Sequence, residues 1–164
     1  MTFPPEYAPM PQANSPAPEL SPSLQWLNAD PQTVAGQQGR VLAIVFWNAA
    51  SAYCHNLLDG LARLQSRYPM GLSILGIHQP KFDSELDGRL VLKAANRLGL
   101  GFPVANDRTW TTWQHYGIQS WPSVALIDTR GRLREVFAGD PHLAAIDGAI
   151  ASLIDEVGGA TVAA

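Results

Sequence analysis

Hydrophobic positions recur along the first half of the chain in two alternating patterns. Residues 41–46 (VLAIVF) and 72–78 (LSILGIH) are short apolar runs, and a run without a polar face is typical of a central strand covered on both sides. Leucines recur at three- and four-residue spacing over residues 51–68 and 84–99, a pattern that predicts amphipathic helices. Strands and helices therefore alternate, which indicates parallel strands joined by right-handed crossovers.

The second half of the chain predicts a different arrangement. Residues 102–107 and 108–117 indicate a short strand and a short helix. Residues 123–139 contain two apolar segments separated by a glycine-bearing turn, a pattern typical of an antiparallel hairpin. A final amphipathic helix is expected from about Pro141 to Val157, with Asp140 as its N-cap.

This order of elements predicts an α/β fold: a mixed central sheet flanked by helices on both faces, with an antiparallel hairpin and a helix at the C-terminal end. Residues 23–157 are expected to form one domain that starts with an edge strand at residues 24–28. Residues 1–22 hold seven of the 13 prolines and predict a flexible arm, either a plain leader or a polyproline II ligand for a proline-binding module. Residues 158–164 are expected to be a flexible tail.

Composition narrows the classes of function. The chain has 46% hydrophobic and 15% charged residues and a net charge of −3, and its lysines and arginines are scattered, so no nucleic-acid partner is expected. No apolar run reaches the roughly 18 residues that a membrane span needs, and the N-terminal residues lack the pattern of a secretory signal. We therefore expect a cytoplasmic protein without a membrane partner and without a cofactor.

Candidate chemical groups are few. Cys54 is the single cysteine, so an intrachain disulfide and a cysteine-only metal site are both excluded. No two of the four histidines have the spacing of a helical zinc pair, and no metal is expected. His78 ends a buried strand, where ligands collect in α/β sheets, but a solvated loop that leads into a capped helix is the favoured interpretation of Asp83, Ser84 and Glu85.

Cys54 lies close to the point where a strand gives way to a helix. The first turn of a helix stabilises a thiolate because unpaired backbone N–H groups converge there. If the helix begins near residues 50–52, Ser51 takes the exposed position at its start and Cys54 lies one turn deeper. Burial would then raise the pKa of the Cys54 thiol.

Two segments together resemble a known family. Residues 45–54 (VFWNAASAYC) are similar to the strand and helix start that carry the C-x-x-C motif of thioredoxin-like proteins, and residues 116–128 (YGIQSWPSVALID) are similar to the cis-proline loop of that superfamily. The chain resembles redoxin-type thiol-disulfide oxidoreductases, and within them most closely the thioredoxin-like domain found before NHL repeats. The resemblance covers about residues 24–157.

The resemblance implies a peptide-binding groove. Pro122 takes the position of the cis-proline, Trp121 that of the residue whose backbone faces bound peptide, and Ser123 that of the start of the next strand. Trp47 belongs to the Phe-Trp pair of the first motif and is expected with Trp121 along this groove. The implied partner is a protein or peptide bound beside Pro122.

Departures from the family pattern decide the expected function. Ser51 occupies the position of the nucleophilic cysteine, Cys54 is the remaining resolving cysteine, and Val45 replaces a buried acid that assists proton transfer. A serine needs an adjacent base to act as a nucleophile, and none is evident nearby. The sequence therefore predicts a redox-inactive peptide- or protein-binding module. The alternative is a monothiol oxidoreductase in which Cys54 forms mixed disulfides for cell redox homeostasis, so whether the protein is an enzyme stays open here.

Overall fold

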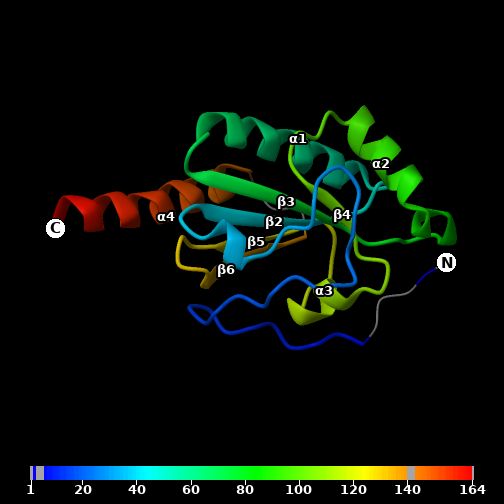
Figure 1. Ribbon diagram of the computed structural model, residues 1–164, viewed down its shortest axis with the longest axis horizontal. Helices are drawn as coiled ribbons and strands as arrows, with labels where there is room; N and C mark the ends of the chain where they lie inside the picture. Colours follow the sequence, from blue (N-terminus) through cyan, green and yellow to red (C-terminus); the bar gives the residue numbers. More distant parts are fainter. Residues whose placement is uncertain (1, 3–5, 140–142, 164) are drawn as a thin grey trace.

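A six-stranded mixed sheet runs through the molecule in the order β1-β4-β3-β2-β5-β6 (Figure 1). The computed structural model describes residue 2, residues 6–139 and residues 143–163. The strands are β1 (Gln25–Trp26), β2 (Val41–Trp47), β3 (Leu72–His78), β4 (Val104–Asn106), β5 (Ser123–Ile127) and β6 (Leu133–Ala138). The helices are α1 (Ala52–Arg67), α2 (Gly88–Arg97), α3 (Thr111–His115) and α4 (Leu143–Ala163), with 3-10 turns η1 (Ala35–Gln37) and η2 (Asp83–Leu86).

Strand pairing confirms the predicted mixture of directions. β2 pairs in parallel with β3, and β3 in parallel with β4, while β5 pairs antiparallel with both β2 and β6. β1 is an edge strand, antiparallel to β4. The parallel strands end together, because the register aligns Trp47 with His78 and His78 with Asn106.

Two apolar clusters cover the two faces of the sheet, as the apolar runs predicted. Successive side chains of a strand point to opposite faces, so Val41 and Val45 of β2 pack with α1, α2 and α4, while Leu42 and Phe46 pack with α3 and the segment that precedes β1. Figure 1 shows α1 and α2 above the sheet and α3 below it. β2 is fully buried at the centre of the fold.

The proline-rich segment lies against the domain. The N–H of Asn14 donates to the C=O of Leu133 at 2.6 Å, and the N–H of Leu133 donates to the C=O of Ser15 at 2.9 Å. Leu20 is buried against the lower face of the sheet. The residues between the prolines supply the N–H groups that prolines lack, so packing begins upstream of residue 23.

Helix boundaries differ from the sequence pattern in two places. The helix expected at residues 84–99 is divided into η2 and α2, with Asp87 as the N-cap between them. α4 continues past Val157. The N-cap expected at Asp140 and the first helical position expected at Pro141 lie outside the described residues. Within the described part of the chain, none of the helices has the length and apolar character to span a membrane.

Candidate functional site

The carboxyl ends of the parallel strands form a polar layer beneath the start of α1. Each of β2, β3 and β4 is followed by one buried polar residue, and these are Asn48, Gln79 and Asp107. The side chain of Asn48 donates to the C=O of Gln79 at 2.9 Å and accepts from the N–H of Ala50 at 2.9 Å. The loop that enters α1 is therefore tied to the loop that leaves β3.

Ser51 is the N-cap of α1. Its backbone is extended, with φ −96° and ψ 118°, and its hydroxyl oxygen accepts a hydrogen bond from the N–H of Cys54 at 3.3 Å. The N–H of Ser51 donates to the C=O of Asn48 at 3.2 Å. The hydroxyl thus satisfies a free N–H of the first turn, which is the usual role of a serine at this position.

Cys54 lies one turn deeper, as the sequence predicted. Its side chain is 0% exposed and packs in the cluster on the α1 face of the sheet. Burial raises the pKa of the Cys54 thiol, and hydrogen bonds to Ser51 and to the Asn48 backbone only partly oppose this effect. The thiol is neutral and shielded, whereas a reactive cysteine is an exposed thiolate.

The loop before β5 lies beside this helix start. The peptide bond between Trp121 and Pro122 is cis, and Ser123, the next residue, pairs with Phe46 of β2. Pro122 and Ser123 are buried, while Trp121 is partly exposed. The Ser123 hydroxyl donates to the C=O of Ser120 at 2.7 Å and is not free to face a ligand.

Trp47 is placed differently from the residues of this loop. The sequence resemblance put it along the groove, but its side chain is 0% exposed. Its ring meets the ring of His78 edge to face, with 4.8 Å between centroids. Trp47 packs in the core because it is the last residue of the central strand, where both faces of the sheet are covered. A bound peptide has no exposed Trp47 surface to contact.

The Trp121 side chain is held by contacts with two aromatic rings and by a hydrogen bond. Its ring lies 5.5 Å from that of Trp110 and 5.3 Å from that of Trp113. Its indole N–H donates to the side-chain oxygen of Gln79 at 3.0 Å, and the Gln79 amide donates to Asp107 at 3.1 Å. Burial raises the pKa of the Asp107 carboxyl, although several backbone and side-chain donors lower it in part.

Glu85 is a member of the site that the sequence interpretation placed in solvent. Its carboxylate is buried, 3.1 Å from Nε2 of His78, and it accepts from the side chain of Asn48 at 3.0 Å. Nδ1 of His78 lies 3.0 Å from the side-chain oxygen of Asn106. Burial opposes ionisation of Glu85, but hydrogen bonds from His78 and from the N–H of Phe82 outweigh it, so the pKa of Glu85 falls below its ordinary value.

The solvated-loop interpretation is therefore wrong for Glu85. η2 turns the chain so that Glu85 points back into the polar layer, while Asp83 and Ser84 stay exposed. Two signals were available in the sequence. Glu85 stands three residues after Phe82, the spacing by which a glutamate reaches back to the N-cap N–H, and His78 at the strand end needs a buried partner.

Two exposed aromatic side chains stand on the segments around the polar layer. Tyr53, in the first turn of α1, is 64% exposed, and Phe82, in the loop after β3, is 44% exposed. With the exposed part of Trp121 they supply apolar surface on the three segments that meet at this edge. Groups of three or more histidine, cysteine, aspartate or glutamate side chains arranged for a metal ion do not occur in the described part of the chain.

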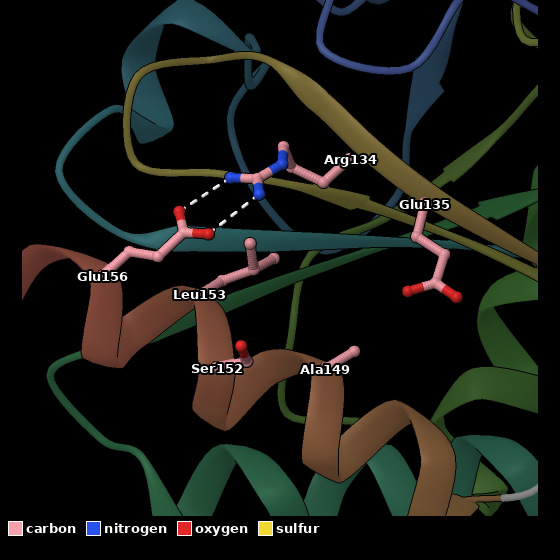
Figure 2. A pocket seen from close by; sticks show the side chains of 6 residues that line it. All are labelled: Arg134, Glu135, Ala149, Ser152, Leu153 and Glu156. Atoms are coloured by element: carbon pink, nitrogen blue, oxygen red, sulfur yellow. Dashed lines mark hydrogen bonds and ion pairs between the residues drawn. The ribbon is translucent and has the colours of Figure 1, made fainter.

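A hollow of about 160 Å³ lies between β6 and α4, away from the loop around Pro122. Figure 2 shows Arg134 and Glu156 paired across it, with nitrogen–oxygen distances of 2.7 and 2.8 Å. Arg134 also contacts Asp128 at 3.3 Å. The Arg134 guanidinium is therefore already paired, and its ion pair with Glu156 joins α4 to β6.

Sequence comparison places the chain among proteins of one family. A family model described as Redoxin matches residues 12–150. Protein SUPPRESSOR OF QUENCHING 1, chloroplastic, of Arabidopsis thaliana is 31% identical over 153 residues, which are 92% of this chain and 14% of that protein. NHL repeat-containing protein 2 of Gallus gallus is 31% identical over 129 residues, which are 76% of this chain and 18% of that protein. The chain spans less than a fifth of either relative.

Structural comparison agrees about the fold. The solution structure of a thioredoxin-like protein in its oxidised form matches with a TM-score of 0.78 at 20% sequence identity. The match covers 87% of this chain and 97% of that one. At this identity the likeness concerns the thioredoxin-like α/β fold alone.

Proposed function

The chain belongs to the redoxin family of thioredoxin-like proteins, relatives of thiol-disulfide oxidoreductases, and we propose that it is a redox-inactive member. Its function is to bind an extended peptide or protein segment at the loop around Pro122. The burial of Cys54 beneath the N-cap Ser51 is the observation that carries this proposal.

Dithiol exchange needs two thiols, one of them exposed as a thiolate. The attacking sulfur opens the substrate disulfide, and the second thiol then displaces the product and completes the transfer of two electrons. The chain has one thiol, Cys54, and that thiol is buried with a raised pKa. Ser51 cannot replace the attacking sulfur, because its hydroxyl caps the helix and the nearest histidine, His55, contacts the C=O of Ala49 at 2.8 Å.

The binding surface does not depend on the thiol. Neither the N–H nor the C=O of Trp121 has a hydrogen-bond partner among the described residues. An extended chain can pair with the backbone groups of such a residue, and the affinity then comes from main-chain hydrogen bonds with side-chain contacts for selectivity. Tyr53, in the first turn of α1, and Phe82, in the loop after β3, supply exposed aromatic surface on segments at the same end of the sheet, and aromatic groups dominate the energetics of peptide contacts.

A monothiol oxidoreductase is the competing function. It requires the Cys54 sulfur to reach a partner sulfur, and a side chain that is 0% exposed cannot do so without local opening of α1. The raised pKa of the Cys54 thiol also lowers its thiolate fraction at neutral pH. Both features favour the binding function over the monothiol enzyme.

Two assays test the proposal. In insulin reduction with dithiothreitol, wild type and Cys54→Ala should both equal the reagent alone; turnover that is lost in Cys54→Ala would overturn the redox-inactive assignment. On an array of extended peptides, wild type should bind a subset, and Tyr53→Ala should weaken that binding. Met70→Ala is the matched control, since Met70 is also exposed but precedes β3 at the opposite end of the sheet. Equal loss in both variants, or no binding by wild type, would contradict the binding function.

A further inference from the structure

The loop after β3 is contacted by Thr2 from the N-terminal part of the chain. The N–H of Thr2 donates to the C=O of Lys81 at 3.1 Å, and the hydroxyl of Thr2 donates to the C=O of Pro80. Pro80 is buried in this arrangement, whereas Lys81 and Phe82 are exposed. Two consecutive carbonyls of one loop therefore accept hydrogen bonds from one residue of the N-terminal arm.

The inner side of the same loop is fixed by Glu85. One carboxylate oxygen accepts from the N–H of Lys81 at 3.1 Å and from the N–H of Phe82 at 3.0 Å. The other faces His78 at 3.1 Å. The buried carboxylate thus holds the N–H groups of Lys81 and Phe82, while the carbonyls of Pro80 and Lys81 accept from Thr2.

This loop adjoins the proposed binding edge. Gln79, which directly precedes Pro80, accepts the indole hydrogen of Trp121 at 3.0 Å. The N–H of Gln79 donates to the C=O of Trp47 at 3.1 Å. Trp121 is thus tied through the Gln79 side chain to the residue that directly precedes Pro80, so the Pro80 and Lys81 carbonyls belong to the loop that neighbours the Trp121 loop.

Backbone packing farther along holds the arm on the same side of the molecule. A Cβ placed on Gly117 would lie 2.6 Å from Cα of Met10 and 2.8 Å from the C=O oxygen of Pro9. Gly117 has φ +62° and stands four residues before Trp121 in the loop that leads to Pro122. The arm therefore contacts both loops that frame the site, one at Thr2 and one at Pro9 and Met10.

We propose that the carbonyls of Pro80 and Lys81 form a second hydrogen-bonding edge of the peptide site, and that Thr2 occupies it as a built-in competitor. This inference rests on the proposed peptide-binding function and adds its regulation. The ligand class is an extended polypeptide that presents N–H or hydroxyl donors. A ligand displaces Thr2, so its apparent affinity is reduced by the fraction of molecules in which the edge is occupied.

Thr2→Pro tests the competition, because proline has neither the N–H nor the hydroxyl that Thr2 uses. Thr2→Ser keeps both donors and is the matched control. For a fluorescent peptide selected on the array, Thr2→Pro should lower the Kd at least about fivefold, as expected from the loss of two hydrogen bonds. Thr2→Ser should bind like wild type. An unchanged Kd in Thr2→Pro would overturn the competitor role.

A synthetic peptide of residues 1–11 gives a readout that does not need an external ligand. Added to 15N-labelled Thr2→Pro protein, it should shift the amide resonances of Lys81 and Phe82 saturably, and less so in wild type, where the edge is filled. Because a tether supplies an effective concentration of about millimolar, millimolar peptide is the relevant range. If the peptide does not shift these amide resonances in Thr2→Pro, the proposal that the Pro80 and Lys81 carbonyls form a binding edge is overturned. Shifts here with no array binding by any variant would instead count against the proposed function.

Discussion

The hydroxyl oxygen of Ser51 accepts a hydrogen bond from the N–H of Cys54 at 3.3 Å, and this contact joins the two residues on which redox chemistry would depend. It places Ser51 at the N-cap of α1 and Cys54 inside the first turn, facing the core. The position with access to solvent carries a hydroxyl, and the thiol lies where solvent does not reach. The fold thus keeps both positions of the C-x-x-C motif, but the position nearer to solvent carries no thiol.

Cys54 should be inert toward thiol reagents in the native protein. With 5,5′-dithiobis(2-nitrobenzoic acid), we expect no labelling before unfolding and one equivalent after it, because the side chain is fully buried and its thiol pKa is raised. Cys54→Ala should keep the fold at a cost of about 1 kcal/mol, whereas Cys54→Ser should cost about 1–3 kcal/mol by burying another hydroxyl. Labelling of native protein at the rate of a free model thiol would refute the buried assignment.

Ser51→Cys should create a dithiol on this scaffold. The new thiol would stand at the partly exposed N-cap, where the N–H groups of the first turn stabilise a thiolate, and Cys54 lies one turn away as the resolving partner. We expect insulin reduction with dithiothreitol above the wild-type background, with loss of the activity in Ser51→Cys combined with Cys54→Ala. Loss of the serine cap should cost about 1 kcal/mol, measurable by urea unfolding. A folded but inactive Ser51→Cys protein would show that more than the nucleophile is missing.

Glu85 should stabilise the fold only while it is ionised. Its pKa in the folded state is below the ordinary value, so its contribution is complete above the unfolded pKa and is lost as the pH falls through the folded pKa. Glu85→Gln should lower the free energy of unfolding by about 3 kcal/mol near neutral pH, and the difference from wild type should shrink toward about pH 3.

The comparison between these two proteins isolates Glu85. Asp107 affects the pH dependence of stability in the opposite direction, since burial raises its pKa. It is present in both wild type and Glu85→Gln, so its effect cancels in the difference between their free energies of unfolding. Asp147→Asn is a useful control because Asp147 accepts from Arg67 and Tyr68 away from the polar layer. A difference between wild type and Glu85→Gln that stays constant from neutral to acid pH would contradict the ionised state of Glu85.

Gln79 should hold Trp121 in place. Gln79→Ala removes the acceptor for the Trp121 indole hydrogen and the donor to Asp107, and leaving buried polar groups without partners costs about 1–3 kcal/mol. We expect a red shift in tryptophan fluorescence and weaker peptide binding. Gln114→Ala, at an exposed position on α3, should stay within about 0.5 kcal/mol of wild type. Unchanged fluorescence in Gln79→Ala would show that Gln79 does not hold the Trp121 side chain in place.

Much of the fold could be read from local pattern. The runs at residues 41–46 and 72–78 are apolar on both faces, and only a central strand between two layers of helices buries such a run. The hairpin at residues 123–139 was equally visible from its turn. Periodicity did not show that residues 84–99 contain a break, because η2 and α2 present apolar side chains at spacings that a single helix would also give.

The sequence predicted those parts of the candidate site whose residues lie close together in a single motif. Ser51 at the helix start and Cys54 one turn deeper follow from spacing along a single helix. Trp47 lies next to the same motif, yet whether it lines a groove or the core depends on what covers the end of β2, which the linear sequence does not specify.

The sequence by itself determined the alternation of strands and helices, the loss of the second thiol and the place of Ser51 at a helix start, because each depends on residues close together along the chain. Only the tertiary structure decided that Glu85 pairs with His78 beneath the site and that Thr2 lies on the carbonyls of Pro80 and Lys81. The physical reason is that local pattern sets which groups must be buried or paired, whereas the partner that pairs with each of them is brought there by the packing of the whole chain.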